Sequence, residues 1–341
     1  MDVTNGKSVG LGVLGCADVA ARRVLPAVAA SSSIHLVAVA SRDWKRAERY
    51  VRQHGGDAVT GYEALLDRDD VDAVYVPLPA GLHAEWIERA LRAGKHVLGE
   101  KPLTTSIDDT RRLFELAEQL GLVMHENFMF CNHPMHAEVL RLAASGAVGD
   151  VRSFSATFTI PGRPEGDIRL RPDLGGGALY DTGGYPLRAA QMFLGPELEV
   201  RGAFLRFAGS AVDLGGSVLL VRPDDGVWAN LTFGLDDAYR STYALAGSAG
   251  RIEVDHVFTP PADHLPTARL TTPSGTVPVS LPAYDQCRAS VQRFADAVLG
   301  ATAFPSREAV TSINQARLTD EIHEFAQALG PPAHRHTEEE S

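Results

Sequence analysis

The first 126 residues alternate short apolar runs with segments that carry apolar residues at helical spacing. The apolar runs stand at 8–14, 34–40, 58–62, 73–77, 96–98 and 123–127. Strands that alternate with helices pair in parallel, because each helix returns the chain to the end of the sheet at which the previous strand began. The pattern therefore predicts a doubly wound α/β domain over residues 1–126.

The rest of the chain has a different pattern. Between residues 151 and 281, short strand-like runs follow one another with turn residues between them, and helical patterns are few. This predicts an α+β domain over 127–330, built on a large open, mostly antiparallel sheet with helices on one face. Nothing in the chain is predicted to cover the other face, so we expect a homo-oligomer, a dimer or tetramer, to bury it. The tail 331–341 is rich in Pro, His and Glu and is expected to be disordered.

Two glycine patterns compete for a phosphate-binding turn after the first apolar run. Gly10-x-Gly12-x-x-Gly15 has the literal dinucleotide-binding spacing, but it lies inside the predicted strand. Gly15-x-Ala17-x-x-Ala20 begins where the strand ends and runs into a predicted helix, where a tight turn and close backbone approach to a pyrophosphate need small residues. We therefore choose the second pattern and interpret 1–126 as a dinucleotide-binding Rossmann domain. The cofactor contacts expected in this turn are Gly15, Cys16, Ala17, Asp18 and Val19.

The end of the second apolar run indicates which dinucleotide is bound. A NAD-binding unit usually places Asp or Glu there to hold the ribose 2′-hydroxyl, whereas this chain has Ser41-Arg42 followed by Asp43. A hydroxyl and a guanidinium suit a 2′-phosphate, which favours NADP(H) over NAD(H). The alternative is an ordinary surface arginine.

Glu100-Lys101-Pro102 follows the fifth apolar run. Pro102 ends the strand and leaves Lys101 at the carboxyl edge of the sheet, where ligands bind in open α/β folds. Only four of the 32 Lys and Arg residues are lysines, so a lysine here indicates more than a need for positive charge. Burial can lower the pKa of a lysine into the working range, which makes Lys101 a candidate for proton transfer. The alternative is a solvent-facing lysine paired with Glu100.

Further cofactor contacts are expected along the same sheet edge. The fourth apolar run ends in a Pro- and Gly-rich loop, 77–83, whose last residue is His83. His83 is a candidate to contact the nicotinamide or its ribose, or else it is simply the first residue of a helix. The remaining expected contacts are Tyr62, Leu78, Pro79, Glu100 and Lys101.

Composition and charge exclude several classes of protein. A net charge of -11 argues against a nucleic acid or an anionic membrane as the main partner. Cys16, Cys131 and Cys287 are odd in number and widely spaced, which argues against a disulfide framework or a metal site and fits a reducing, cytoplasmic compartment. The polar start has no apolar signal core, and no run reaches the roughly 18 apolar residues of a membrane span.

Five motifs spread over nearly the whole chain occur together in one known family. The motifs are Gly15-Cys16-Ala17-Asp18-Val19-Ala20, Pro79-Ala80-Gly81-Leu82-His83, Glu100-Lys101-Pro102-Leu103, Phe128-Met129-Phe130 with His133-Pro134, and Leu174-Gly175-Gly176-Gly177-Ala178-Leu179-Tyr180-Asp181-Thr182-Gly183-Gly184-Tyr185. Together they resemble the glucose–fructose oxidoreductase, inositol dehydrogenase and rhizopine-catabolism oxidoreductase family. In that family the lysine lies beside the nicotinamide and the Lys–Pro bond is often cis, so the resemblance implies both for Lys101–Pro102.

One residue separates this chain from the inositol dehydrogenase branch, which has histidine four residues after the motif aspartate. Here that aspartate is Asp181 and the later residue is Tyr185. The tyrosine form resembles dihydrodiol and pentose dehydrogenases and, more closely, nucleotide-sugar 3-ketoreductases of antibiotic deoxysugar pathways. The resemblance implies NADPH-dependent reduction of the C-3 keto group of a dTDP-linked deoxy sugar, with Lys101 as the proton donor and Tyr185 assisting.

The expected substrate contacts are Arg23, Lys101, Arg169, Asp181 and Tyr185. We expect Lys101 and Tyr185 to lie within hydrogen-bonding reach of one substrate oxygen, and Arg163 and Arg171 to face solvent. Two alternatives stay open, a NADP-dependent dehydrogenase of a free sugar, polyol or dihydrodiol and a non-catalytic NADP-binding sensor. Arginines beside a diphosphate would favour the nucleotide sugar, because a free sugar needs no such cations.

Overall fold

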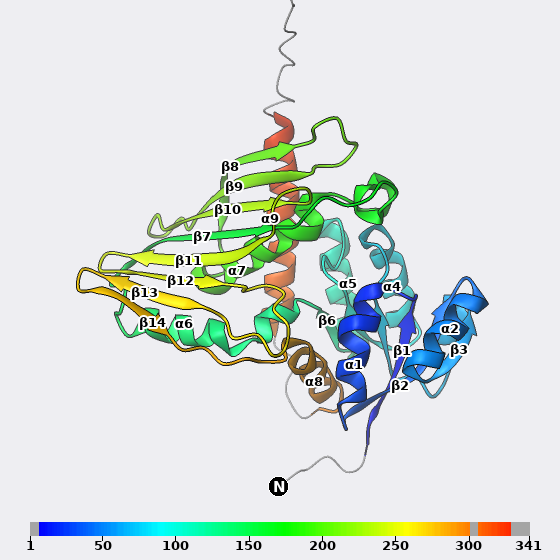
Figure 1. Ribbon diagram of the computed structural model, residues 1–341. Coiled ribbons are helices and arrows are strands. Elements are labelled where there is room, and N and C mark those ends of the chain that lie inside the picture. Colours follow the sequence, from blue (N-terminus) through cyan, green and yellow to red (C-terminus); the bar gives the residue numbers. More distant parts are fainter. Residues whose placement is uncertain (1–6, 301–305, 329–341) are drawn as a thin grey trace, which may run out of the picture.

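The chain forms two sheets that lie side by side in a computed structural model, which describes residues 7–300 and 306–328 (Figure 1). The first sheet contains β1 (Val9–Leu14), β2 (Ile34–Ser41), β3 (Asp57–Thr60), β4 (Ala73–Val76), β5 (His96–Gly99) and β6 (Met124–Glu126). All of its pairs are parallel and the strand order is β3-β2-β1-β4-β5-β6, as the alternating runs predict. The order reverses between β1 and β4, and ligands bind at the carboxyl ends of the strands around such a point.

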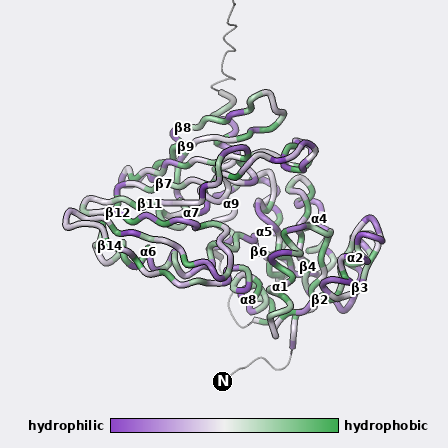
Figure 2. Tube along the Cα trace, in the orientation of Figure 1, coloured by the Kyte–Doolittle hydropathy of each residue, from purple (hydrophilic) through white to green (hydrophobic). Residues whose placement is uncertain are grey.

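Helices cover both faces of this first sheet, so its central strands β1 and β4 are hydrophobic and buried along their length (Figure 2). They are α1 (Leu25–Ala29), α2 (Trp44–His54), α3 (Tyr62–Leu66), α4 (His83–Arg92) and α5 (Ile107–Leu120). A wider helical turn, Ala20–Val24, precedes α1 where one regular helix is expected from the sequence. Pro26 has no N–H to donate back to the turn before it, which accounts for the irregularity.

The second sheet has eight strands and is mostly antiparallel, as predicted. Its strands are β7 (Val151–Thr159), β8 (Glu199–Arg206), β9 (Gly215–Val221), β10 (Trp228–Gly234), β11 (Arg240–Gly247), β12 (Arg251–Asp255), β13 (Ala268–Thr272) and β14 (Gly275–Val279). The strand order is β14-β13-β12-β11-β7-β10-β9-β8, and only the β7–β10 pair is parallel. The large sheet therefore places β7 at its centre.

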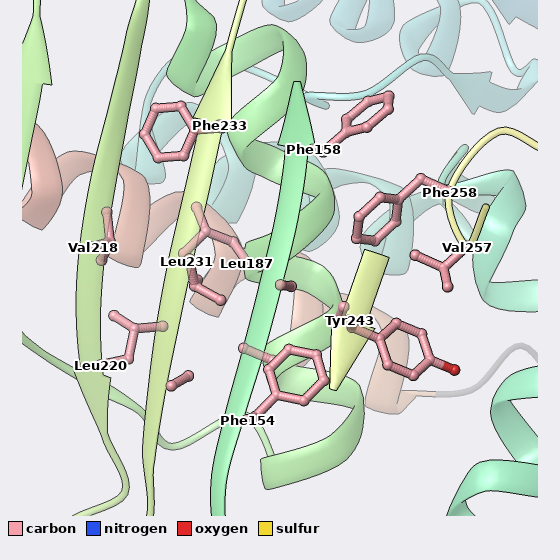
Figure 3. Close-up of a cluster of buried hydrophobic side chains, with 14 of the residues drawn as sticks. Phe154, Phe158, Leu187, Val218, Leu220, Leu231, Phe233, Tyr243, Val257 and Phe258 are labelled. Atoms are coloured by element: carbon pink, nitrogen blue, oxygen red, sulfur yellow. The ribbon is translucent and has the colours of Figure 1, made fainter. Parts of the chain in front are cut away.

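Helices pack against one face of the second sheet. They are α6 (Pro134–Ala144), α7 (Gly184–Leu194) and α9 (Ser306–Ala328). Figure 3 shows Phe154, Leu231 and Tyr243 from three neighbouring strands beside Leu187 of α7, and all four side chains are buried. Side chains alternate between the two faces along each strand, so the residues next to these in the sequence point to the opposite face. On that face, Trp228 of β10 is 41% exposed.

One helix crosses from the second half of the chain to the first sheet. Helix α8 (Gln286–Val298) packs beside α1 (Figure 1) and buries Val291 and Phe294 in the same hydrophobic cluster as Val9 and Leu25. The division of the chain at residue 126 stays a prediction, and α8 shows that the second segment completes the core of the first. No helix in the described ranges is long and apolar enough to span a bilayer. The tail 331–341 lies outside the described residues.

Candidate active site

The turn after β1 has the backbone geometry that the second glycine pattern requires. Gly15 has φ +100°, and its N–H donates to the Ala40 carbonyl oxygen at 2.8 Å. A Cβ atom at Gly15 would lie 3.0 Å from the Leu78 side chain, so a larger residue would close the space above the turn. Gly10 and Gly12 lie inside β1, where a Cβ would collide with packed neighbours. Gly10 and Gly12 are therefore packing glycines, and the turn at Gly15 stays the predicted cradle for a dinucleotide phosphate.

Two arginines follow β2, at the expected ribose end of this cradle. Arg42 lies close to the side chain of Tyr62, whose pKa is raised by burial and partly lowered again by that cation. Arg46, which sequence reasoning missed, donates to the Cys16 carbonyl oxygen at 2.9 Å. It lies in the first turn of α2, four residues after Arg42 and close to the end of β2, a position that would have identified it. The Ser41 hydroxyl is buried and accepts from the Asp43 N–H at 3.2 Å, so it helps to shape the strand end. These groups fit an anionic ribose phosphate.

Lys101 and Asp181 form the centre of the candidate site. The Lys101 ammonium donates to the Asp181 carboxylate at 2.9 Å and to its backbone carbonyl at 2.7 Å. The other carboxylate oxygen of Asp181 accepts from Arg169 Nε at 2.8 Å, and Arg169 also contacts Asp167. The Lys101–Pro102 peptide bond is cis, as the resemblance implies. The alternative of a solvent-facing lysine paired with Glu100 is wrong, because the Lys101 side chain is only 11% exposed and Asp181 is its partner.

The charges in this centre stabilise each other. Burial alone would lower the pKa of Lys101, but Asp181, with Tyr185 and Glu100, outweighs burial and raises it. Burial alone would raise the pKa of Asp181, but Lys101 and Arg169 lower it to about 2. The expectation of a lowered lysine pKa is therefore wrong, and the reason is the carboxylate. Lys101 is held in the protonated form, which is the form that can give a proton to a substrate oxygen.

Tyr185 lies beside Lys101 in an aromatic cluster. The Lys101 ammonium is 5.0 Å from the centre of the Tyr185 ring, and the rings of Phe158 and Phe258 pack against it at 4.8 and 5.6 Å. Burial raises the pKa of Tyr185 to about 12, although Lys101 acts in the opposite direction. Among the described residues no hydrogen bond joins Lys101 to the Tyr185 hydroxyl. Their shared contact with one substrate oxygen stays a prediction.

Two predicted cofactor contacts, Glu100 and His83, are turned inward. Glu100 Oε1 accepts from the Tyr75 hydroxyl at 2.6 Å and from Asn127 Nδ2 at 2.7 Å. Both ring nitrogens of His83 contact backbone carbonyl oxygens, of Leu78 at 2.7 Å and of Pro102 at 2.8 Å. Both residues are less than 8% exposed, and the Glu100 Oε1 atom and both His83 ring nitrogens are engaged, because buried polar groups need partners. In this structure Glu100 and His83 fix the strand ends around Lys101, and their contact with the cofactor stays a prediction.

The remaining arginines of the prediction divide into two groups. Arg163 is exposed and Arg171 pairs with Asp173, so both face solvent as expected. Arg23 is half-buried, and it contacts the Cys287 thiol at the start of α8 rather than Asp181 or Lys101. The structure thus unites Lys101, Arg169, Asp181 and Tyr185 in one centre. It places Arg23 outside this centre, beside Cys287 at the start of α8.

A buried ion pair that sequence reasoning missed holds the lysine loop against α7. Arg188 of α7 pairs with Glu126 at the end of β6, and its guanidinium lies 4.4 Å from the centre of the Phe128 ring. The same Glu126 carboxylate accepts from the Leu103 N–H at 2.9 Å, two residues after Lys101. This pair couples the position of Lys101 to the helix that carries Tyr185.

Comparison with known proteins agrees with this geometry. Residues 9–128 match the model described as "Oxidoreductase family, NAD-binding Rossmann fold", and residues 136–253 match the GFO/IDH/MocA C-terminal domain. The chain is 50% identical to a dTDP-3,4-didehydro-2,6-dideoxy-alpha-D-glucose 3-reductase of Actinomadura kijaniata, over 95% of this chain and 98% of the relative. It is 38% identical to a D-xylose 1-dehydrogenase (NADP(+)) of Haloferax volcanii, over 93% of this chain and 97% of that relative.

Solved structures give the same result. A 3-ketoreductase from Actinomadura kijaniata, in complex with NADP and TDP-benzene, superposes with a TM-score of 0.91 at 50% identity, covering 93% of this chain and 98% of the other. Further structures of that 3-ketoreductase carry a tyrosine-to-phenylalanine or a lysine-to-alanine substitution.

Proposed function

The chain belongs to the GFO/IDH/MocA oxidoreductase family, and we propose that it is an NADPH-dependent 3-ketoreductase acting on a dTDP-linked deoxy keto-sugar. The observation that carries this function is Lys101, buried against Asp181 at the carboxyl edge of the first sheet and beside Tyr185. Two relatives that are 50% identical over most of the chain are named as reductases of this class of substrate. They support the nucleotide sugar over a free sugar.

Reduction of a ketone needs a hydride at carbon and a proton at oxygen. The nicotinamide of NADPH supplies the hydride when it is bound, and the residues that would hold the cofactor are the turn at Gly15 with Arg42 and Arg46. Lys101 gives its proton to the carbonyl oxygen, where negative charge develops as the carbon–oxygen double bond is reduced. Asp181 keeps that proton on Lys101 until the oxygen becomes basic. Tyr185 assists by hydrogen-bonding the same oxygen and by closing the site to water.

The substrate assay tests this function directly. We expect rapid oxidation of NADPH, with NADH much slower, when a dTDP-3,4-diketo-2,6-dideoxy sugar is generated in situ, and a C-3 alcohol as product. Tight binding of NADPH without turnover of the nucleotide sugar would contradict the proposal. Turnover of D-xylose or a dihydrodiol instead would establish the free-sugar alternative, which the 38% identical D-xylose dehydrogenase keeps open. A protein that binds NADPH but reduces none of these substrates would be the sensor.

The preference for NADPH gives a prediction at the ribose end of the cofactor. Arg42→Gln should raise the KM for NADPH by about ten- to a hundredfold, because one charge-assisted hydrogen bond to a phosphate contributes about 1.5–3 kcal/mol. The KM for NADH should stay unchanged, since NADH has no 2′-phosphate. Arg52→Gln, on an exposed arginine later in α2 that pairs with Glu48, is the matched control. An equal effect on both cofactors would contradict the assignment.

The open face of the second sheet supports a homo-oligomer. Trp228 lies on this face between Val221 and Ser153, and Phe204 of β8 is 50% exposed on it. Apolar side chains on an uncovered sheet favour burial against a second copy of the chain. Trp228→Glu should therefore halve the mass of the particle measured by light scattering at micromolar concentration, with the circular dichroism spectrum unchanged. A wild-type monomer at that concentration would contradict the proposal.

The cysteines support a reducing, cytoplasmic location. Cys16, Cys131 and Cys287 are all free thiols. Burial raises the pKa of Cys131 to about 12 and that of Cys287 to about 11, so both stay protonated and unreactive at neutral pH. None of the three forms a disulfide bond, as we expect of a protein in a reducing compartment.

A further inference from the structure

The helix that carries Asp181 and Tyr185 begins without a capping side chain of its own. Its start is a wider helical turn, Leu179–Gly183, which continues directly into α7. Ala178 stands at the N-cap, and its methyl group offers no acceptor to the first N–H groups of the helix. Ala178 and the first helical residue are both buried, so these N–H groups need partners from elsewhere in the chain.

Asp213 lies in the loop that joins β8 to β9 (Figure 1) and supplies these partners. Its Oδ2 atom accepts from the Leu179 N–H at 2.7 Å, and its backbone carbonyl oxygen accepts from the Ala178 N–H at 2.8 Å. The residue is 3% exposed. The next residue, Leu214, donates its N–H to the Arg206 carbonyl oxygen at 2.7 Å, which ties the loop to β8. The large sheet therefore holds the cap in a fixed place.

The carboxylate of Asp213 acts as a helix cap and not as half of an ion pair. No cation in the described ranges pairs with it, and the titratable side chain that feels its charge is Tyr180. Burial raises the pKa of Asp213 to about 6, while hydrogen bonds from backbone N–H groups act in the opposite direction. At neutral pH the group is thus an anion at the positive end of a helix, where negative charge is favourable.

Gly177 leaves room for this carboxylate. It has φ +125°, and a Cβ atom there would lie 2.3 Å from Asp213 Oδ1. The Gly177 carbonyl oxygen accepts from the Asp181 N–H at 3.0 Å, within the same turn. The last glycine of the glycine-rich motif and the distant aspartate therefore fix the backbone at Asp181 together.

The place of this backbone matters directly to Lys101. The Lys101 ammonium donates to the Asp181 backbone carbonyl oxygen at 2.7 Å, as well as to the carboxylate at 2.9 Å. Burial acts to lower the pKa of Lys101. The groups that act to raise it are Asp181, Tyr185 and Glu100, of which the first two belong to the capped helix. A displaced helix start would therefore weaken both contacts of the ammonium group.

We propose that Asp213 is a positioning residue for the reduction, which acts through Asp181 by holding the start of its helix against Lys101. The inference rests on the proposed function and deepens it, because it extends the catalytic centre to a loop of the large sheet. Asp213→Ala leaves the buried Leu179 N–H without its acceptor, so the turn shifts and the contact between Asp181 and Lys101 loosens.

NMR of the lysine side chains tests this inference without any turnover. The chain has four lysines, so the signals of isotope-labelled lysine in the full chain are few, and Lys101→Met assigns the one that matters. Asp213→Ala should lower the measured pKa of Lys101 by about half a pH unit and kcat by about tenfold, with NADPH affinity unchanged. Asp213→Asn keeps an oxygen for the Leu179 N–H, so kcat should stay within about threefold of the wild type.

Two matched controls and a second variant accompany this measurement. Asp225→Ala removes an aspartate that accepts from the Val227 N–H at 3.2 Å in the turn between β9 and β10, and should change neither the pKa of Lys101 nor kcat. Gly177→Ala keeps Asp213 but places a methyl group against its carboxylate, and should lower the pKa of Lys101 to a similar extent. Gly195→Ala, at φ +94° with open space around it at the other end of α7, is its control.

The outcomes separate this inference from the proposed function. A wild-type pKa of Lys101 in both Asp213→Ala and Gly177→Ala would overturn the inference, and Gly177→Ala decides if Asp213→Ala does not fold. An equal fall in Asp213→Asn and Asp213→Ala would also overturn it, because Asp213 would then act through its charge and not as a cap. A wild type that does not reduce the dTDP-keto-sugar would refute the proposed function, and the NMR result would still show whether Asp213 positions Asp181.

Discussion

Lys101→Met is expected to lower kcat for ketone reduction by about a thousandfold, within the range of general acid catalysis, while NADPH affinity changes by less than about twofold. Methionine keeps the length and apolar stem of the lysine but has no proton to give. The groups proposed to hold the cofactor are the turn at Gly15 and Arg42, and among the described residues neither contacts the ammonium group. Steady-state NADPH oxidation on the dTDP-keto-sugar gives kcat, and fluorescence titration gives the affinity for NADPH.

Two further variants make the Lys101 result specific. Lys45→Met removes an exposed lysine at the start of α2 and should leave kcat unchanged. Tyr185→Phe should reduce kcat much less than Lys101→Met, by about tenfold, because Lys101 remains as the proton donor. Loss of NADPH binding in step with kcat in Lys101→Met would show that the lysine holds the cofactor and is not the acid.

The features that sequence predicted well are local ones. The six apolar runs and the turn at Gly15 are set by neighbours within a few residues, and the structure reproduces them. Pro102 has no N–H to donate to a neighbouring strand, so β5 ends before it. The place of Lys101 at the sheet edge was therefore predictable. Tyr185 was found because it stands at a fixed distance from Asp181, which the glycine-rich motif marks.

The features that sequence missed depend on partners far away in the chain. Glu100 is predicted from the sequence as a cofactor contact, and the sequence does not show that its Oε1 atom accepts from Tyr75 and Asn127, which lie 25 and 27 residues away. The pKa of Lys101 is raised because Asp181, 80 residues further on, lies against it. No local pattern reports such a contact. The same holds for Arg23, which meets Cys287 only because α8 returns to the first half of the chain.

Asp181→Asn should lower kcat at neutral pH by about a hundredfold and move the basic limb of the pH profile to lower pH. The carboxylate is the group that raises the pKa of Lys101 against the effect of burial. Without it burial dominates, the pKa of Lys101 falls, and the proton is lost at a lower pH as the pH rises. The amide also offers only one acceptor oxygen to two cations, Lys101 and Arg169. Because the pKa of Lys101 is raised above the ordinary lysine value of about 10.4, a pH profile of kcat from about 7 to 11.5 measures the shift.

Asp167→Asn is the control that separates Lys101 from the rest of the charged centre. Asp167 contacts Arg169 at 3.2 Å, and among the described residues it makes no contact with Lys101. Its replacement removes one partner of the arginine, so we expect a small loss of stability and an unchanged basic limb. If Asp181→Asn keeps the wild-type limb, the carboxylate does not set the protonation of Lys101. Asp181 contacts Lys101 directly and Asp167 does not. If Asp167→Asn shifts the basic limb as strongly as Asp181→Asn, the pKa of Lys101 therefore depends on the total charge nearby and not on the direct contact with Asp181.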